Sequence, residues 1–383
     1  MITWSVSREK HNNSVTRAYM DICKATRKYE GWLGKQIPLI EDDLDRKHSA
    51  MTKDVFSFLR ATYYRWIQLW PEVCHSCDDA PQVLGVGDLH IENYGTWRDI
   101  EGRLVWGIND FDESCELPYT VDLVRLATSA HLAIHEEHLK IAPKDACTVI
   151  IEGYRKGLDA GGRPFVLAEH HGWLRETVSG ILRDPEKFWA KLDNIPALQT
   201  PIPFSARKAI EKLLPESGLE YRAAHRVAGL GSLGRERYVA IADYRGGKVA
   251  REAKALAAPA VAWANKKTGS DRIHYQEILD TAVRSPDPFV RLKGRWIVRR
   301  LAPDCSRVEL ASIPKQRDES RLLYSMAFEI ANVHLSKPKN ARAILRDLQK
   351  RPSNWLHRAA FNMTERTVQD WRDWRNNAPS ATA

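Results

Sequence analysis

The sequence reads Gly87-Asp-Leu-His-Ile-Glu-Asn93 after one short apolar segment and Ile108-Asn-Asp-Phe-Asp112 at the end of the next. The apolar segments, residues 82–86 and 103–108, are bounded by turn-forming residues, which predicts two β-strands. Each predicted strand is followed by carboxylate and amide side chains. Two such strands in succession indicate one assembled site rather than two unrelated acidic turns on a solvated edge.

The spacing of these polar residues is typical of phosphoryl transfer. That chemistry needs a carboxylate that orients the attacking hydroxyl, and further oxygen ligands that hold the magnesium ion bridging the phosphates. Asp88 and Asn93 are five positions apart, as are the catalytic aspartate and the metal-binding asparagine of protein kinases. Asp110 follows the next predicted strand, and hard oxygen ligands of this kind suit Mg²⁺.

These elements resemble the G-D-x-H-x-x-N and I-D-F-D motifs of aminoglycoside and choline kinases, which have the protein-kinase-like fold. The chain looks more closely like a bacterial family of unknown function. That second resemblance also rests on residues 56–60 and 122–129 and extends over roughly residues 50–335.

The resemblance implies a role for each acidic or amide residue of the two motifs. Asp88 would be the catalytic base, and Asn93 and Asp110 would bind magnesium. Asp112 would bind a second metal ion or shape the site.

Three further positions carry implications from the same resemblance. Asp122 would match the buried aspartate that supports the catalytic loop. The resemblance also implies a catalytic role for His90. It stands where eukaryotic protein kinases have a lysine that contacts the γ-phosphate. Val86 replaces the histidine of their H-R-D motif, which is usual in small-molecule kinases of this fold and argues against a protein kinase.

A second motif, Gly229-Leu-Gly-Ser-Leu-Gly234, precedes a β-type segment at 238–242. A dinucleotide-binding loop requires a helix directly after the glycines. Strand, glycine turn and strand instead predict the hairpin that covers ATP phosphates in kinases. We expect Gly229, Gly231, Ser232 and Gly234 to bind the phosphates; a purely structural hairpin and a dinucleotide loop are the alternatives.

The strand after this hairpin is expected to supply a cation for the phosphates. Strand alternation places Lys254 and Lys248 on one face and Arg251 on the other. The resemblance favours Arg251, because relatives place a lysine there, whereas Lys254 fits better if the arginine is a true departure. Glu252 and Glu277 are candidates for a pairing glutamate.

The order of the motifs differs from that of kinases, in which the glycine loop comes first. We therefore predict an α+β, protein-kinase-like, two-lobed fold that is circularly permuted, with the helical catalytic lobe before the strand-rich nucleotide lobe. The predicted parts are an N-terminal extension, a catalytic lobe, a nucleotide-binding lobe and C-terminal helices, at residues 1–50, 51–220, 221–315 and 316–383.

Apolar spacing predicts a helix at 54–70, with Asp54 as N-cap and Pro71 as the residue that ends it. The same spacing predicts four further helices, at 120–140, 145–159, 167–192 and 319–335. Residues 195–203 are rich in proline and are predicted to form a linker.

Composition narrows the class of protein. The 383 residues are 43% hydrophobic, with a net charge of +9, which excludes a collagen, a disordered tail protein or a coiled-coil rod. No apolar run is long enough for a membrane span, and the six scattered cysteines are typical of a cytoplasmic protein. The positive charge favours an anionic partner such as a nucleotide; nucleic acid is not expected.

Two weaker motifs are interpreted structurally. Cys74 and Cys77 form one C-x-x-C pair without a second pair at zinc spacing. His131, His135 and His138 could share a helix face but lack an evident fourth ligand. We expect loop thiols and a polar helix face, respectively.

The sequence thus predicts an enzyme that transfers phosphate from ATP, with Mg²⁺, to an unknown hydroxyl of a small molecule or a protein. Three alternatives stay open. They are a non-catalytic nucleotide-binding regulator, an AMP-transferring enzyme and a metal-dependent phosphoesterase.

Overall fold

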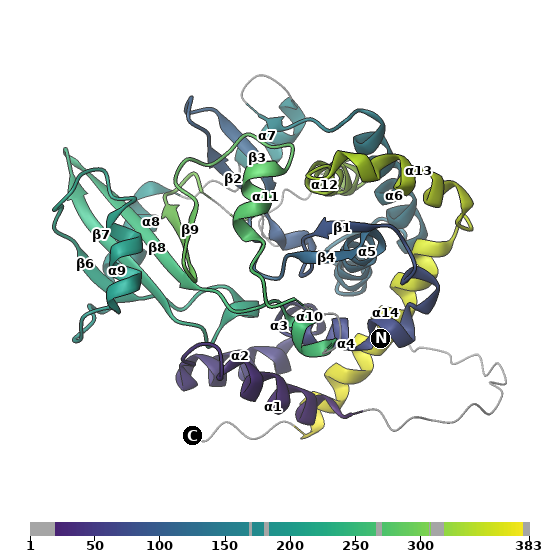
Figure 1. Cartoon of the computed structure of the whole chain (residues 1–383), viewed down its shortest axis with the longest axis horizontal. Helices are drawn as coiled ribbons and strands as arrows, with labels where there is room; N and C mark the ends of the chain where they lie inside the picture. Colours follow the sequence, from purple (N-terminus) through teal and green to yellow (C-terminus); the bar gives the residue numbers. More distant parts are fainter. Residues whose placement is uncertain are drawn as a thin grey trace.

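Helices and antiparallel strands alternate along the chain, which confirms the predicted α+β class (Figure 1). The structure is a computed structural model that describes residues 20–167, 171–179, 184–265, 270–305, 307 and 318–377. Some residues of four predicted parts therefore lie outside the described residues. These parts are the N-terminal extension, the helix at 167–192, the strand-rich region and the C-terminal helices. The protein-kinase-like lobes and their permutation remain predictions.

A five-stranded antiparallel sheet lies at one end of the molecule, in the order β6-β7-β8-β10-β9 (Figure 1). Its strands are β6 (Arg222–His225), β7 (Arg237–Tyr244), β8 (Gly247–Ala255), β9 (Arg291–Lys293) and β10 (Trp296–Leu301). Helix α8 (Pro185–Asp193) packs on one face through Phe188, and helix α9 (Phe204–Glu211) packs on the other through Ile210. Both faces of the sheet are thus covered, and the strand-rich character predicted for this region is confirmed.

The two strands predicted before the acidic motifs exist, but they belong to different sheets. β1 (Gln82–Gly85) pairs with β4 (Cys115–Pro118), whereas β3 (Leu104–Ile108) lies between β2 (Tyr94–Arg98) and β5 (Phe165–Val166). In the β2–β3 pair, the first residue of β2 is opposite the last residue of β3. This register brings the residues after β3 next to the segment that follows β1.

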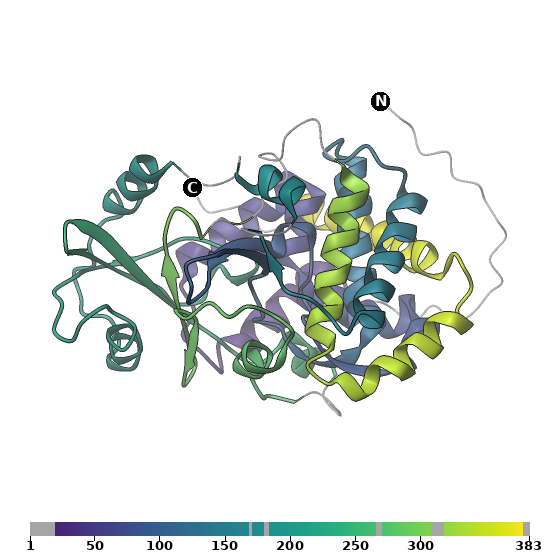
Figure 2. The ribbon, with the colours of Figure 1, turned by 90° about the horizontal axis from the view of Figure 1, so that it is seen from above.

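Most of the other described elements are helices, of which α3, α6, α12 and α14 pack around α5 (Tyr119–His135), whose side chains are almost all buried. Helices α6 and α12 run alongside each other in both views (Figures 1 and 2). The other helices are α1 (Ile22–Leu33), α2 (Glu41–Lys53), α3 (Val55–Ala61), α4 (Tyr63–Val73), α6 (Pro143–Asp159), α7 (Gly172–Ser179), α10 (Ala260–Ala264), α11 (Tyr275–Thr281), α12 (Glu319–His334), α13 (Ala341–Lys350) and α14 (Trp355–Asn377). Within the described part of the chain, short 3₁₀ turns lie at His75–Cys77, Ile91–Asn93, Leu230–Ser232 and Pro338–Asn340. Among the described residues, no helix combines the length and apolar character that a bilayer crossing requires.

The predicted helix at 54–70 is two helices, α3 and α4, which is a correction. Asp54 does cap α3, since its carboxylate accepts a hydrogen bond of 2.6 Å from the Ser57 amide. The break falls at Thr62, whose hydroxyl donates to the Phe58 carbonyl at 2.6 Å and whose backbone is not helical. Pro71 lies inside the last turn of α4 rather than ending it, and the helix closes with a bond from the Cys74 amide.

The predicted helix at 167–192 is also divided. Its described residues form α7 and α8, while residues 168–170 and 180–183 lie outside the described part of the chain. Asp184 caps the second helix through the Lys187 amide. Both helices are amphipathic and share the helical period, so their apolar residues look like one continuous helical pattern in the sequence.

Helices α6 and α12 approach closely because α6 carries Gly153 at the contact. A Cβ atom at this position would lie 2.1 Å from the Tyr324 carbonyl oxygen, a backbone atom that cannot rotate away. We expect Gly153→Ala to lower the free energy of unfolding by about 3 kcal/mol, measured by urea denaturation. Gly31→Ala is the matched control, because nothing lies within 4 Å of its Cβ. It should stabilise the protein by up to about 1 kcal/mol, and an equal loss in both variants would contradict the packing argument.

Candidate active site

Asp122 of α5 binds the backbone of the segment that follows β1. Its carboxylate accepts hydrogen bonds from the amides of Val86 (2.7 Å) and Gly87 (2.8 Å) and contacts His334 at 2.9 Å. Gly87 has a φ of +82°, and a Cβ there would lie 2.5 Å from the Glu113 carbonyl oxygen. The buried aspartate therefore supports this loop, and only glycine fits at the turn.

Asp88 projects from this turn into a buried pocket. Arg125 of α5 donates to its carboxylate at 2.7 Å and to the Leu59 carbonyl at 2.7 Å. The guanidinium lies over the rings of Tyr63 and Trp66, 5.4 and 5.2 Å from their centroids. Burial raises the pKa of Asp88, and Arg125 opposes that rise. The carboxylate is thus fixed in position and more basic than an ordinary aspartate.

Asn93 joins the two acidic motifs. Its amide nitrogen donates to the backbone carbonyls of Asp88 (3.1 Å) and Asp110 (3.2 Å). This orientation leaves the amide oxygen buried without a hydrogen-bond partner, and the same is true of Oδ1 of Asp112. Buried oxygen atoms without donors are costly, so the site is suited to a cation that binds oxygen. The donor set of amide and carboxylate oxygens fits magnesium.

Lys254 of β8 reaches the same carboxylates from the five-stranded sheet. Its Nζ lies 3.2 Å from Asp110 and 2.5 Å from Asp112. Burial lowers the pKa of Lys254, and the two carboxylates oppose this. Burial alone would raise the pKa of Asp110, but Lys254 and nearby arginines hold it well below its usual range. Burial and the charge of Asp110 raise the pKa of Asp112.

Arg251, the cation that the resemblance favoured, is not brought to this site. It lies on the opposite face of β8, where it donates to the Leu213 carbonyl at 2.7 Å and stacks on Phe289. The two candidate glutamates also lie elsewhere. Glu252 is enclosed by arginines such as Arg237, and Glu277 pairs with Arg272 and His274.

The glycine motif forms the connection between β6 and β7, as predicted for a hairpin. Its middle residue, Gly231, packs directly against the acidic site. A Cβ there would lie 2.9 Å from the Arg60 carbonyl oxygen and 3.3 Å from Oδ2 of Asp88. Gly229 has a φ of +75°, and the Ser232 hydroxyl accepts a 2.7 Å hydrogen bond from Arg237. The loop therefore covers Asp88.

Helix α2 anchors this loop from the other side. The Ile40 amide donates to the Gly234 carbonyl at 2.9 Å, and a Cβ at Gly234 would clash with Leu44. Asp43 contacts His225 of β6 at 2.9 Å. Residues 20–50, which fall in the predicted N-terminal extension, thus help to position the glycine loop.

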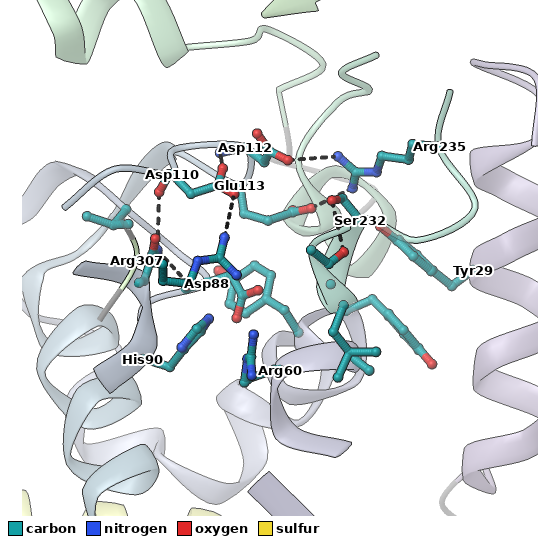
Figure 3. Close-up of a pocket in the computed structure, with 18 residues that line it drawn as sticks. Tyr29, Arg60, Asp88, His90, Asp110, Asp112, Glu113, Ser232, Arg235 and Arg307 are labelled. Atoms are coloured by element: carbon teal, nitrogen blue, oxygen red, sulfur yellow. Dashed lines mark hydrogen bonds and ion pairs between the residues drawn. The ribbon is translucent and has the colours of Figure 1, made fainter. Parts of the chain in front are cut away.

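Several charged residues of the site escaped the sequence analysis (Figure 3). Arg235 pairs with Glu113 at 2.9 Å and lies 3.7 Å from Asp112. Arg60 pairs with Glu92 at 2.5 Å. The third arginine, Arg307, lies 4.0 Å from Asp110. Arg60 belongs to the segment 56–60 that carries the family resemblance, but the sequence alone gave no role to any of the three arginines, because each is brought in by a separate element.

His90 lies beside Arg60 on the floor of this pocket (Figure 3). Its Nδ1 is buried without a hydrogen-bond partner. Burial and then the nearby Arg60 charge hold its pKa well below the usual range. The ring is therefore neutral at pH 7 and available as a hydrogen-bond partner.

Two cavities adjoin these residues. The smaller, about 50 Å³, is bounded by the acidic residues and by the glycine loop. The larger, about 1240 Å³, lies next to it and is lined by aromatic and cationic side chains including Phe111, Tyr275 and Arg299. Gly229 and Arg307 line both cavities. The acidic site therefore borders a cavity large enough for a nucleotide.

Behind β3, Glu329 of α12 is buried against the strand that leads to Asp110. It accepts a hydrogen bond of 2.6 Å from Asn332 and one of 3.4 Å from the Ile108 amide. Burial raises its pKa to about 7. The folded protein thus keeps a proton that the unfolded chain releases near pH 4.5.

Stability should therefore fall as pH rises between about 4.5 and 7, and this carboxyl should contribute about 3 kcal/mol to the fall. We expect Glu329→Gln to remove that contribution, so urea denaturation at pH 5 and pH 8 should show a smaller difference than in the parent protein. The exposed Glu365→Gln is the control and should follow the parent protein. Parallel pH profiles for all three proteins would contradict the assigned pKa.

Comparison with known proteins gives one match. Residues 39–172 match the model of a family described as an uncharacterized protein conserved in bacteria (DUF2252). The matched segment contains both acidic motifs and ends before the glycine loop. No curated protein and no solved structure matches the chain. The predicted resemblance to a bacterial family of unknown function is therefore supported over these residues.

Proposed function

We propose that this protein is an ATP- and magnesium-dependent phosphotransferase with a permuted protein-kinase-like arrangement. One observation carries the proposal. The glycine loop (residues 229–234) lines one pocket with Asp88, Asn93 and Asp110, and Lys254 contacts Asp110, although more than 100 residues separate the two groups in the sequence.

The placement of these parts on the five-stranded sheet supports the proposal. Protein kinases carry a glycine-rich loop over the ATP phosphates and a phosphate-binding lysine on the third strand. Here the glycine loop joins the first two strands of the sheet, and Lys254 lies on the third. The acidic residues precede this sheet in the sequence, so the arrangement agrees with a circular permutation.

Asn93, Asp110 and Asp112 are the residues that would hold magnesium. When bound, the ion would neutralise charge on the phosphates. Lys254 pairs with both aspartates, and once magnesium binds these carboxylates its ammonium group would be available to a phosphate group. Arg307 faces the same space and adds a second positive charge.

Asp88 would accept the proton of the acceptor hydroxyl. Arg125 holds this carboxylate in one orientation, and its aromatic surroundings exclude water from the far side. The adenosine part would occupy the larger cavity, in which Phe111 and Tyr275 offer aromatic surfaces.

A non-catalytic regulator would be favoured if the site lacked the lysine that binds the ATP phosphates in kinases. Lys254 supplies a lysine on the face of β8 that meets the acidic residues, so catalysis is the better-supported function. The structure gives no separate support to the phosphoesterase, because that reaction leaves the glycine loop without a role.

Calorimetric titration of the full chain with a non-hydrolysable ATP analogue tests the proposal. We expect binding that strengthens when Mg²⁺ is added. Binding that is indifferent to Mg²⁺ would indicate a regulator, and no binding would contradict the nucleotide site. Products formed from ATP then separate the transfers: ADP indicates phosphate transfer, whereas pyrophosphate indicates AMP transfer.

A further inference from the structure

A second group of ligand-type side chains lies among the helices, away from the glycine loop. His131 of α5, Cys147 of α6 and His357 of α14 place their ligand atoms within 4.8 Å of one another. His131 Nε2 is 3.4 Å from the Cys147 sulfur, and the two histidine rings meet edge to face with centroids 5.3 Å apart. His131 and Cys147 are buried, and His357 is partly exposed.

We propose that His131, Cys147 and His357 form a binding site for a zinc-type transition metal that joins α5, α6 and α14. Imidazole and thiolate are the ligands that zinc prefers, and three protein ligands plus water complete a tetrahedral shell. The partly exposed side of His357 leaves room for that water.

The distances agree with such a site. Ligand atoms around tetrahedral zinc are about 3.3–3.6 Å apart, and the measured nitrogen–sulfur distance of 3.4 Å already falls in this range. The ligand atom of His357 lies within 4.8 Å of the other two, and a rotation of its side chain can bring it closer. Its Nδ1 is buried without a hydrogen-bond partner, so coordination would satisfy an atom that the protein leaves unpaired.

The proposed metal site matches neither of the two weaker motifs of the sequence, the Cys74–Cys77 pair and the three histidines at 131, 135 and 138. His135 is the last residue of α5 and His138 follows the end of that helix, which is shorter than the predicted 120–140. Both histidines are exposed and lie outside the cluster. Among the described residues, Cys74 and Cys77 belong to no group of three ligand-type side chains. The tertiary contact of three helices, rather than a spacing on one of them, creates the site.

Metal binding would replace the thiol proton of Cys147, which leaves to solvent as the sulfur–metal bond forms. The bound ion would tie the C-terminal helix α14 to α5, the helix that carries Asp122 and Arg125. The expected consequence is greater stability of the folded chain, because the unfolded chain lacks a preformed site.

Cobalt(II) tests the site directly, because a thiolate ligand on cobalt gives a charge-transfer absorption band that oxygen ligands do not give. We expect the reduced full chain to bind one equivalent of Co²⁺ with this band, and Zn²⁺ to displace it. Excess Mg²⁺ should leave the band unchanged, since magnesium prefers oxygen ligands. Zn²⁺ alone should raise the melting temperature.

Three variants locate the ligands. Cys147→Ser should abolish the band, and His357→Ala should weaken Co²⁺ binding at least tenfold, whereas His135→Ala should behave like the parent protein. If Cys147→Ser does not fold, the comparison of His357→Ala with His135→Ala decides. Absence of the band in the folded parent protein, its survival in Cys147→Ser, or equal affinity in the two histidine variants would overturn the proposal.

Discussion

Asp88→Asn is expected to lower the rate of ATP turnover by about 100- to 10,000-fold, the usual contribution of a positioned general base. The amide keeps the shape of the carboxylate but cannot accept the proton of the acceptor hydroxyl. It can still face Arg125, so the fold should persist. The measurement is ADP formation from ATP with saturating Mg²⁺ and a panel of hydroxyl compounds as acceptors.

The parent protein should also show an acidic limb in its pH–rate profile. Burial raises the pKa of Asp88, so the rate should increase with pH as this carboxyl loses its proton, at a pH above that of an ordinary aspartate. Asp243→Asn is the matched control, because this carboxylate is almost fully exposed at the end of β7. Undiminished turnover in folded Asp88→Asn would refute the assignment of the base.

The second large effect is expected for Asp110→Asn, which should remove the Mg²⁺ dependence of ATP-analogue binding. Asp110 contributes the carboxylate that lies between Lys254 and Arg307. Loss of one charged contact corresponds to about 1.5–3 kcal/mol, or about 10- to 100-fold in affinity. Calorimetric titrations with and without Mg²⁺ measure this difference.

Two controls make the Asp110→Asn result specific. Asp243→Asn should retain the Mg²⁺ effect, and circular dichroism should show that Asp110→Asn is folded. Binding that stays Mg²⁺-dependent in folded Asp110→Asn would remove this residue from the proposed metal site. The same titrations on Cys147→Ser distinguish the two proposed metal sites. Cys147 lies outside the acidic pocket, so this variant should keep the Mg²⁺ effect on binding of the ATP analogue.

The local parts of the site could be predicted from the sequence because their signals are local. Short apolar segments that end in Asp88 and Asp110 predicted β1 and β3, and both strands exist. The glycines at 229–234, followed by a β-type segment, predicted a hairpin, and the chain forms one there. The same local reasoning missed the break at Thr62, since a side-chain hydrogen bond to a preceding carbonyl leaves no trace in apolar periodicity.

The choice between Lys254 and Arg251 shows where sequence reasoning stops. Strand alternation correctly placed the two cations on opposite faces of β8. Which face meets the acidic residues depends on how the sheet packs between α8, α9 and the rest of the chain, and no residue near 254 encodes that. Arg125 and Arg235 were given no role for a related reason, since their contacts with Asp88 and Glu113 depend on how separate elements pack.

The sequence by itself determined the chemical types at the site: the carboxylates and amide of residues 88–112 and the flexible backbone of the glycine loop. These follow from residue identity and from backbone preferences over a few neighbouring positions. Only the tertiary structure decided which cations face Asp88 and Asp110, and that His131 meets Cys147 and His357. Those contacts depend on the burial of entire helix and sheet faces, which joins residues hundreds of positions apart.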